Sequence, residues 1–251
     1  MRTLMDKTGR TQRRLFLIGA ASLTLSACGA DLLGPPEAGP LYPLRPTFPA
    51  AAAGEKVNWA LSIMRPDVPG GLDTDRIALL QTDGTMDYYA KATYPDRLPA
   101  IIQRTVIEGF EASGRIGAIA RAQDALHADY NLLVEVKDFQ AVYKVADGVP
   151  QAVVAISAKL TTAHGRKIIG SLAVSKSVDA GANSTGAATQ ALSQALGQAV
   201  SEIVVWTLAT APAIVPGQSP ESSTASPGRE LLKDVTRGSE GLRQSTTPAP
   251  Q

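Results

Sequence analysis

Residues 131–160, NLLVEVKDFQAVYKVADGVPQAVVAISAKL, decide the fold of this chain. Apolar and polar side chains alternate over residues 132–136, which is typical of a strand with one buried face, because successive side chains point to opposite faces. The alternation continues over residues 139–143 with the opposite parity. This change of phase predicts a one-residue β-bulge near Lys137-Asp138.

Two turn signals divide the region around this strand. Asp-Gly at 147–148 precedes an alternating run over residues 152–160, and His-Gly at 164–165 precedes a further apolar run over residues 168–174. Turn residues between alternating runs indicate hairpins. Residues 131–178 therefore predict an antiparallel meander of three strands.

Shorter strands are expected on the amino-terminal side of the meander. Residues 57–64 alternate between apolar and polar positions, which predicts a half-buried strand. Residues 76–81 and 85–90 flank Asp83-Gly84, and an Asp-Gly pair between apolar runs is a strong hairpin signal.

The first helix is expected to begin after Asp96, whose side chain is a candidate amino-terminal cap, with Pro99 in the first turn. Gly114 is placed to end this helix in the left-handed conformation. A short strand over residues 116–120 follows.

A long second helix is expected to begin at Asn183 or Ser184 and to end before Pro212. Besides its alanine-rich stripe it carries a second apolar row, formed by Leu196, Val200 and Val204. We consider two explanations of this row. Either the first helix and a loop cover it, or part of this surface, or an exposed strand edge, forms a homo-oligomer.

The order β-β-β-α-β-β-β-β-α predicts an α+β fold for residues 56–211. We expect a two-layer sandwich, in which a mainly antiparallel sheet packs with two helices on one face. Residues 28–55 are rich in Pro and Ala and are expected to form a tether. Residues 212–251 are rich in Pro, Ser and Thr and are expected to be a disordered tail.

The chain begins like an exported bacterial protein. Five basic residues precede or open an apolar run over residues 15–25, and Leu25-Ser26-Ala27-Cys28 follows, containing the single cysteine of the chain. The run is too short for a membrane-spanning helix. The ending resembles a lipoprotein lipobox, which implies a signal peptide over residues 1–27, cleavage between Ala27 and Cys28, and acylation of Cys28. The alternative is a buried free cysteine after an uncleaved helix.

Two further features concern export and sorting. Arg13-Arg14 followed by Leu-Phe-Leu resembles a twin-arginine signal, and both this route and general secretion stay open. Gly29 after the cysteine, in place of an aspartate, favours the periplasmic face of the outer membrane over the inner membrane.

The charge of the chain excludes one class of partner. Removal of residues 1–27 takes away five basic residues and one acidic residue, which leaves 19 Lys and Arg against 22 Asp and Glu. The formal charge changes from +1 to −3. A mildly acidic chain lacks the electrostatic footprint of nucleic-acid binding, so no nucleic-acid partner is expected.

Four motifs, in this order, identify a family resemblance: Tyr-Pro-Leu at 42–44, Gly-Leu-Asp-Thr-Asp-Arg-Ile at 71–77, Tyr-Tyr and Tyr-Pro-Asp-Arg-Leu-Pro within 88–99, and Ala-Asp-Tyr-Asn-Leu at 128–132, running into Asp138-Phe139. Together they resemble the ABC-type transport auxiliary lipoproteins, which include proteins like paraquat-inducible protein C. Tyr94 departs from this pattern, because the family usually has Trp there.

The resemblance implies an accessory role without catalysis. It implies a lipid-anchored partner of an MCE-type periplasmic protein and its ABC permease and ATPase, moving phospholipid or another hydrophobic substrate between membranes. The alternative function is an outer-membrane assembly or envelope-integrity lipoprotein that acts without an ABC system. A periplasmic hydrolase is disfavoured, because no nucleophile and base constellation is found.

Neither a metal site nor a cofactor is expected. His127 and His164 are the two histidines of the chain, and a structural metal site usually draws on three or four ligands. Asp73 and Asp75 lack the pattern of a calcium loop.

Four residues of the family-like segments are candidates for a partner interface, since Arg and Tyr are enriched at interface hot spots: Arg76, Tyr88, Tyr89 and Arg97. The alternative is a purely structural role, in which Asp96 caps the helix and the arginines form local pairs.

Overall fold

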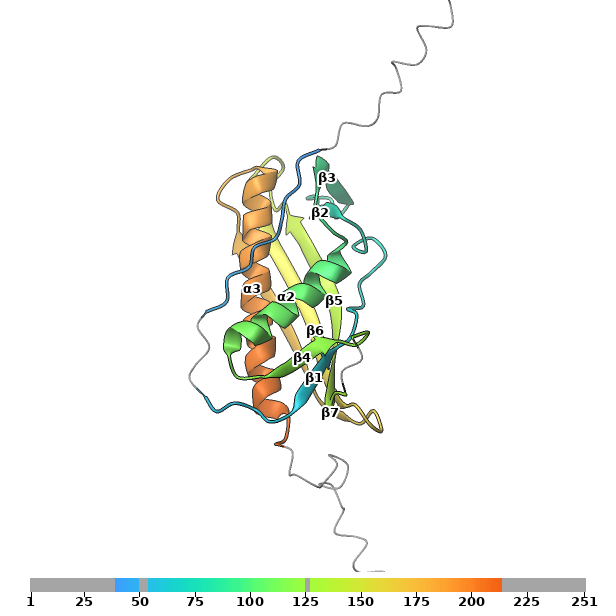
Figure 1. Ribbon diagram of the computed structural model, residues 1–251. Coiled ribbons are helices and arrows are strands. Elements are labelled where there is room, and N and C mark those ends of the chain that lie inside the picture. Colours follow the sequence, from blue (N-terminus) through green and yellow to red (C-terminus); the bar gives the residue numbers. More distant parts are fainter. Residues whose placement is uncertain (1–38, 50–53, 125–126, 214–251) are drawn as a thin grey trace, which may run out of the picture. The chain divides into compact units, whose positions relative to one another are not determined.

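The computed structural model describes residues 39–49, 54–124 and 127–213, and the expected α+β fold is confirmed (Figure 1). This part of the chain forms seven strands and two helices. In chain order they are β1 (Ala60–Ile63), β2 (Arg76–Leu80), β3 (Met86–Thr93), α2 (Leu98–Ser113), β4 (Ala118–Arg121), β5 (Tyr130–Val142), β6 (Gln151–Thr162), β7 (Ile168–Asp179) and α3 (Thr185–Thr210). Three of the expected features lie wholly or mostly outside the described residues: the signal peptide with its cleavage site at Ala27 and Cys28, most of the tether, and the tail from residue 214.

The sheet is mixed, and its centre is the long strand β5. The meander β5–β6–β7 and the hairpin β2–β3 are antiparallel, as expected. β1 pairs in parallel with β4 and with one end of β5, and β2 pairs in parallel with the other end of β5. These parallel pairs join segments that are far apart in sequence, so no local turn signal announced them.

Local signals in the sequence are reproduced in the meander. The register between β5 and β6 shifts between Val136 and Asp138, which confirms the bulge. Gly84 and Gly165 adopt left-handed φ angles of 83° and 77° at the tips of their hairpins. The glycines are needed there because a side chain is strained at such angles.

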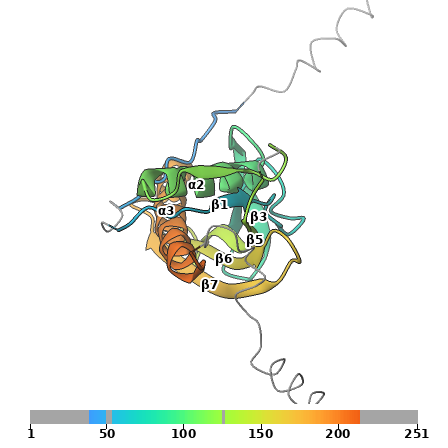
Figure 2. The ribbon, with the colours of Figure 1, turned by 60° about the horizontal axis from the view of Figure 1, so that its bottom comes forward.

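One face of the sheet is apolar and is covered by both helices. In Figure 1, α2 and α3 lie in front of the strands, and α3 runs along β6 and β7. Cross-strand pairs such as Val136 with Ile156 and Phe139 with Val154 are fully buried under this layer. The view in Figure 2 shows the two helices beside each other, and the opposite face of β6 and β7 carries mainly small and polar residues.

Three of the four expected helix ends are confirmed, including the end of α3 at Thr210, before Pro212. Ser184 caps α3, because its Oγ accepts a hydrogen bond from the Ala187 backbone N–H at 3.3 Å. Gly114 ends α2 in the left-handed conformation. The expectation that Asp96 caps α2 is wrong. The cap position belongs to Arg97, and the Leu98 N–H donates to the Thr74 carbonyl at 3.0 Å instead.

The tether ends earlier than the composition suggests. The compact unit that contains the sheet begins at Leu41, and residues 41–48 pack against it. Tyr42 N–H donates to the Thr93 carbonyl at 2.8 Å, and Leu41 forms a parallel bridge with Thr93. Residues 41–48 of the expected tether are therefore an extended segment of the domain, because their alternate side chains contribute to its core.

The second apolar row of α3 is covered from within the chain. Leu196 and Val200 are fully buried, and Val204 is 4% exposed. A Cβ atom on Gly109 of α2 would lie 2.5 Å from Val200 Cγ1 and 3.3 Å from a ring carbon of Phe48. The hypothesis that this row carries self-association is therefore wrong, because α2 and segment 41–48 supply its cover. No helix in the described ranges is long and apolar enough to span a membrane.

Candidate functional site

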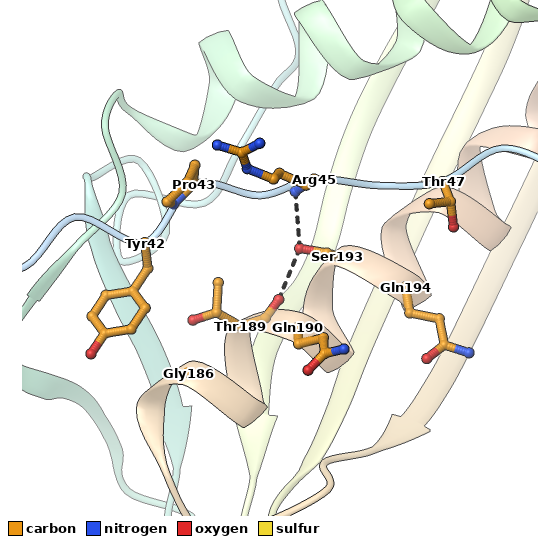
Figure 3. A pocket seen from close by; sticks show the side chains of 9 residues that line it. All are labelled: Tyr42, Pro43, Arg45, Thr47, Gly186, Thr189, Gln190, Ser193 and Gln194. Atoms are coloured by element: carbon orange, nitrogen blue, oxygen red, sulfur yellow. Dashed lines mark hydrogen bonds between the residues drawn. The ribbon is translucent and has the colours of Figure 1, made fainter.

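A groove of ≈ 470 Å³ runs between segment 41–48 and the first half of α3 (Figure 3). Thr189, Gln190, Ser193 and Gln194 line its helix side, so its polar groups are hydroxyls and amides. The Arg45 side chain points away from Ser193 in Figure 3. None of the residues that line the groove is a buried charged residue. We interpret the groove as the packing seam between segment 41–48 and α3, and not as a binding pocket.

Hydrogen bonds hold the segment along this seam. Ser193 Oγ accepts from the Arg45 backbone N–H at 3.2 Å and donates to the Thr189 carbonyl at 2.9 Å. A Cβ on Gly197 would lie 2.6 Å from the Thr47 carbonyl oxygen. The glycine permits this close approach of segment and helix, so the chain that leads to the expected anchor is fixed to α3.

The candidate interface residues Arg76 and Tyr88 meet on the β2–β3 hairpin. The Arg76 guanidinium carbon lies 3.8 Å from the centroid of the Tyr88 ring, which is a cation–π contact. Tyr88 Oη donates a hydrogen bond to the Gly71 carbonyl at 2.8 Å. The stacked pair is exposed or half-buried and is therefore accessible to a partner.

Arg97 holds the same loop from the other side. Its Nη2 donates to the Asp73 carbonyl at 2.6 Å, and Nη2 lies 3.0 Å from Asp73 Oδ1. Tyr88 and Arg97 thus both bind the loop of residues 69–75. We call Arg76, Tyr88, Arg97 and this loop the hairpin patch. The local pairing that was the alternative for these arginines is present, and it leaves the patch exposed.

Tyr89 does not belong to the hairpin patch. Adjacent residues of a strand point to opposite faces, and Tyr89 Oη lies 3.0 Å from Tyr143 Oη. Tyr143 Oη donates in turn to Asn183 Oδ1 at 2.9 Å. Burial, together with the hydrogen bond to Tyr143, raises the pKa of Tyr89 above its ordinary value. Tyr89 therefore joins β3 to β5 and to the loop before α3.

Segment 41–48 was expected to be part of the tether, although its sequence carries the pattern of a half-buried strand. The side chains at 42, 44, 46 and 48 (Tyr, Leu, Pro and Phe) face the domain, while those at the odd positions are exposed. This is the period of a half-buried strand. The prolines between and beside these positions concealed the pattern.

The described residues contain no group of three or more His, Cys, Asp or Glu side chains that could hold a metal ion. His127 and His164 are both exposed. Asp73 is engaged by Arg97, and Asp75 accepts a hydrogen bond from Thr74 Oγ1 at 3.3 Å.

Comparison with known families settles the classification of the domain. The model of the ABC-type transport auxiliary lipoprotein component family matches residues 42–204, which begin in segment 41–48 and end in α3. The chain belongs to this family. Its members are transport auxiliary lipoproteins, and this is not an enzyme family. The family name implies association with an ABC transport system and a membrane-anchored location in the cell envelope.

The chain is also similar to individual proteins of known sequence or structure. The crystal structure of protein XCC0632 from Xanthomonas campestris is 27% identical, with a TM-score of 0.63 over 68% of this chain and 95% of that one. A second crystal structure, of an uncharacterised protein, shares the fold at 15% identity and a TM-score of 0.51, over 66% of this chain and 99% of that one. An uncharacterised protein of Bradyrhizobium diazoefficiens is 26% identical over 127 residues, which are 51% of this chain and 34% of that relative. The match thus spans about a third of the length of this curated relative.

Proposed function

We propose that this auxiliary lipoprotein is a lipid-anchored periplasmic subunit of an MCE/ABC-type transporter that moves phospholipid or another hydrophobic substrate between membranes. The match of the family model to residues 42–204 carries this proposal. The lipobox ending at Cys28 supports it, since acylation there would anchor the chain, with outer-membrane sorting favoured by Gly29.

The early start of the domain limits how far it can stand from the membrane. Twelve residues, 29–40, separate the expected anchor from Leu41. A chain of this length spans at most about 40 Å. Because segment 41–48 is fixed to α3 and β3, it adds no further reach. We therefore expect a partner to meet the amino-terminal end of the domain within about 40 Å of the acylated residue.

The hairpin patch is the proposed docking site for the periplasmic partner. Arg76 and Tyr88 combine an exposed cation with an aromatic ring, and their stacking already orders both side chains. Ordered side chains lose less conformational entropy on binding than mobile ones. Arg and Tyr are also the residue types that most often dominate interface energies.

Co-purification from membranes tests the proposal. The tagged full-length lipoprotein is extracted with a mild detergent, and the captured proteins are identified by mass spectrometry. We expect an MCE-domain protein, a permease and an ATPase to be enriched. Arg76→Glu should reduce their recovery at least about fivefold by placing a like or unpaired charge at the interface. Arg166→Glu, in the exposed turn between β6 and β7, is the matched control and should leave recovery unchanged.

One result would argue against this function, and another would argue against the docking site. Capture of outer-membrane assembly proteins without ABC components would favour the envelope-integrity alternative. Unchanged recovery of the ABC components with Arg76→Glu would keep the transporter assignment and move the docking site away from the hairpin patch.

A further inference from the structure

A second pocket, of ≈ 410 Å³, lies where β1, β4 and α2 meet. Three arginines line it, Arg65, Arg104 and Arg121, together with Gln103, Gln123 and the single carboxylate of Asp96. We call it the arginine pocket. Neither the family motifs nor the hairpin patch include its arginines.

The fold gathers these arginines from three separate elements. β1 and β4 are parallel and in register, with Ile63 opposite Arg121, so both strands end at one edge of the sheet. Arg65 follows β1 by two residues, and Arg121 is the last residue of β4. Ligands of sheets with parallel strands commonly bind beyond such carboxyl ends. The wall opposite this edge is the first half of α2.

The buried amide of Gln103 forms part of the pocket and fixes α2 to the sheet edge. Gln103 is 6% exposed, and its Nε2 donates to the Ile63 carbonyl at 3.0 Å. Arg104, the next residue of the helix, is exposed. The hydrogen bond therefore fixes the helix backbone at Arg104 relative to the end of β1.

Two of the three arginines that line the pocket form no ion pair with a described residue. Among the described residues, Arg65 and Arg121 have no carboxylate within ion-pair distance. Arg104 Nε lies 3.8 Å from Glu108 Oε1, and both side chains are about half exposed, so this pair is weak. Three arginines and the carboxylate of Asp96 thus line the pocket. Two further carboxylates lie next to these arginines: Glu108 beside Arg104, and Asp124, whose Oδ2 accepts the Arg121 backbone N–H at 3.1 Å.

We propose that the arginine pocket binds a phosphate group, carried by a phospholipid headgroup or present as a free phosphate. Guanidinium groups match phosphate oxygens with paired, charge-assisted hydrogen bonds, which lysines do not reproduce. The volume is in the range of small-ligand sites and suits a headgroup without its acyl chains. The phosphate site itself does not depend on the proposed transport function, and only its lipid source does.

Binding is tested on the full-length lipoprotein purified in a non-ionic detergent. Calorimetry measures inorganic phosphate and glycerol 3-phosphate. Native mass spectrometry compares phosphatidylglycerol with diacylglycerol of the same chains. Saturable binding of glycerol 3-phosphate and phosphatidylglycerol, but not of diacylglycerol, supports a headgroup site. Binding of inorganic phosphate without binding of phosphatidylglycerol supports a site for free phosphate.

Variants at the pocket separate a built site from diffuse attraction. Arg65→Gln combined with Arg121→Gln should weaken phosphate binding at least about tenfold. Asp96→Asn removes the opposing charge but keeps the oxygen that accepts the Arg97 N–H, and should strengthen binding about twofold or more. Arg166→Gln removes one exposed charge elsewhere and should change the affinity less than about twofold.

The proposal is overturned if no phosphate compound binds saturably, or if Arg166→Gln weakens binding as much as the pocket variants do. Because co-purification of ABC components does not involve this measurement, failure of the phosphate site leaves the proposed function standing, and the reverse also holds.

Discussion

Tyr94 carries a buried hydroxyl group that forms no hydrogen bond with a described residue. Its side chain is buried, and its ring meets Phe139 edge to face with 6.3 Å between centroids. Its hydroxyl has no hydrogen-bond partner within the part of the chain that the structure describes. Burial raises the pKa of this phenol above its ordinary value, so it stays neutral. The packing of Tyr94 therefore stabilises the fold through its ring alone.

Replacement of Tyr94 tests this view. Tyr94→Phe removes only the unpaired hydroxyl, so the free energy of unfolding should stay the same or rise by up to about 1 kcal/mol. The matched control is Tyr130→Phe, which loses the hydrogen bond from Tyr130 Oη to the Pro212 carbonyl at 2.9 Å. It should lower the free energy by about 1 kcal/mol. Equal losses in both variants, measured by denaturant unfolding, would show that the Tyr94 hydroxyl is paired in solution.

The contact between segment 41–48 and α3 depends on a glycine inside a helix. Glycine usually weakens a helix by about 1 kcal/mol relative to alanine. At Gly197 the backbone of Thr47 occupies the space that a side chain would need. The helix therefore gives up intrinsic stability in exchange for close packing of the segment.

Two glycines of α3 should respond to alanine in opposite directions. Gly197→Ala should lower the free energy of unfolding by about 1–3 kcal/mol and speed hydrogen exchange at the Tyr42 and Arg45 amides. Gly186→Ala meets only Tyr42 Cε1 at 3.9 Å, so it should be neutral or stabilising. Slow exchange at both amides in Gly197→Ala would contradict the proposed fixation of the segment.

Features determined by neighbours in sequence could be predicted, and features determined by distant contacts could not. The bulge near Lys137, the turn at Gly165 and the cap at Ser184 each follow from a few adjacent residues. Asp96 was wrongly expected to cap α2, because the carbonyl of Thr74, from a loop more than twenty residues earlier, satisfies the first helical N–H.

The same distinction applies to the candidate sites. Arg76 and Tyr88 lie on the two strands of one hairpin, so a sequence reading could place them together. Arg65, Arg104 and Arg121 line one pocket only because β1 and β4 pair in parallel. The helix α2, which lies between these strands in sequence, forms the other wall. No periodic pattern in the sequence predicts this pairing, so the arginine pocket could not be predicted from the sequence.

The domain has a large core that includes the buried face of α3, and a smaller cluster formed by Leu79, Ala141 and Ala188. Val200 is fully buried between α2 and the half-buried Phe48. Val200→Asp would place a charge there, so it should lower the free energy of unfolding by more than about 3 kcal/mol. Val205 lies on the same helix and is 58% exposed. Val205→Asp should therefore change the free energy of unfolding by less than about 0.5 kcal/mol. A folded Val200→Asp protein with altered association would reinstate this helix as an interface.

This auxiliary lipoprotein has two separate candidate binding surfaces. The hairpin patch is accessible and includes residues of two of the four family motifs, whereas the arginine pocket lies beyond the ends of β1 and β4. In the proposed function the first surface would bind a protein and the second a phosphate group. The twelve residues between Cys28 and Leu41 would let the domain begin at most about 40 Å from its expected anchor.

A genetic comparison tests the transport function most directly. Outer-membrane permeability to a hydrophobic dye is measured in cells that lack this lipoprotein, in cells that lack the MCE-domain protein of the same system, and in cells that lack both. If the lipoprotein acts only through the transporter, the double deletion should be no more permeable than the more severe single deletion. A double deletion that is clearly more permeable than either single one would contradict the account and show that the lipoprotein acts independently of the ABC system.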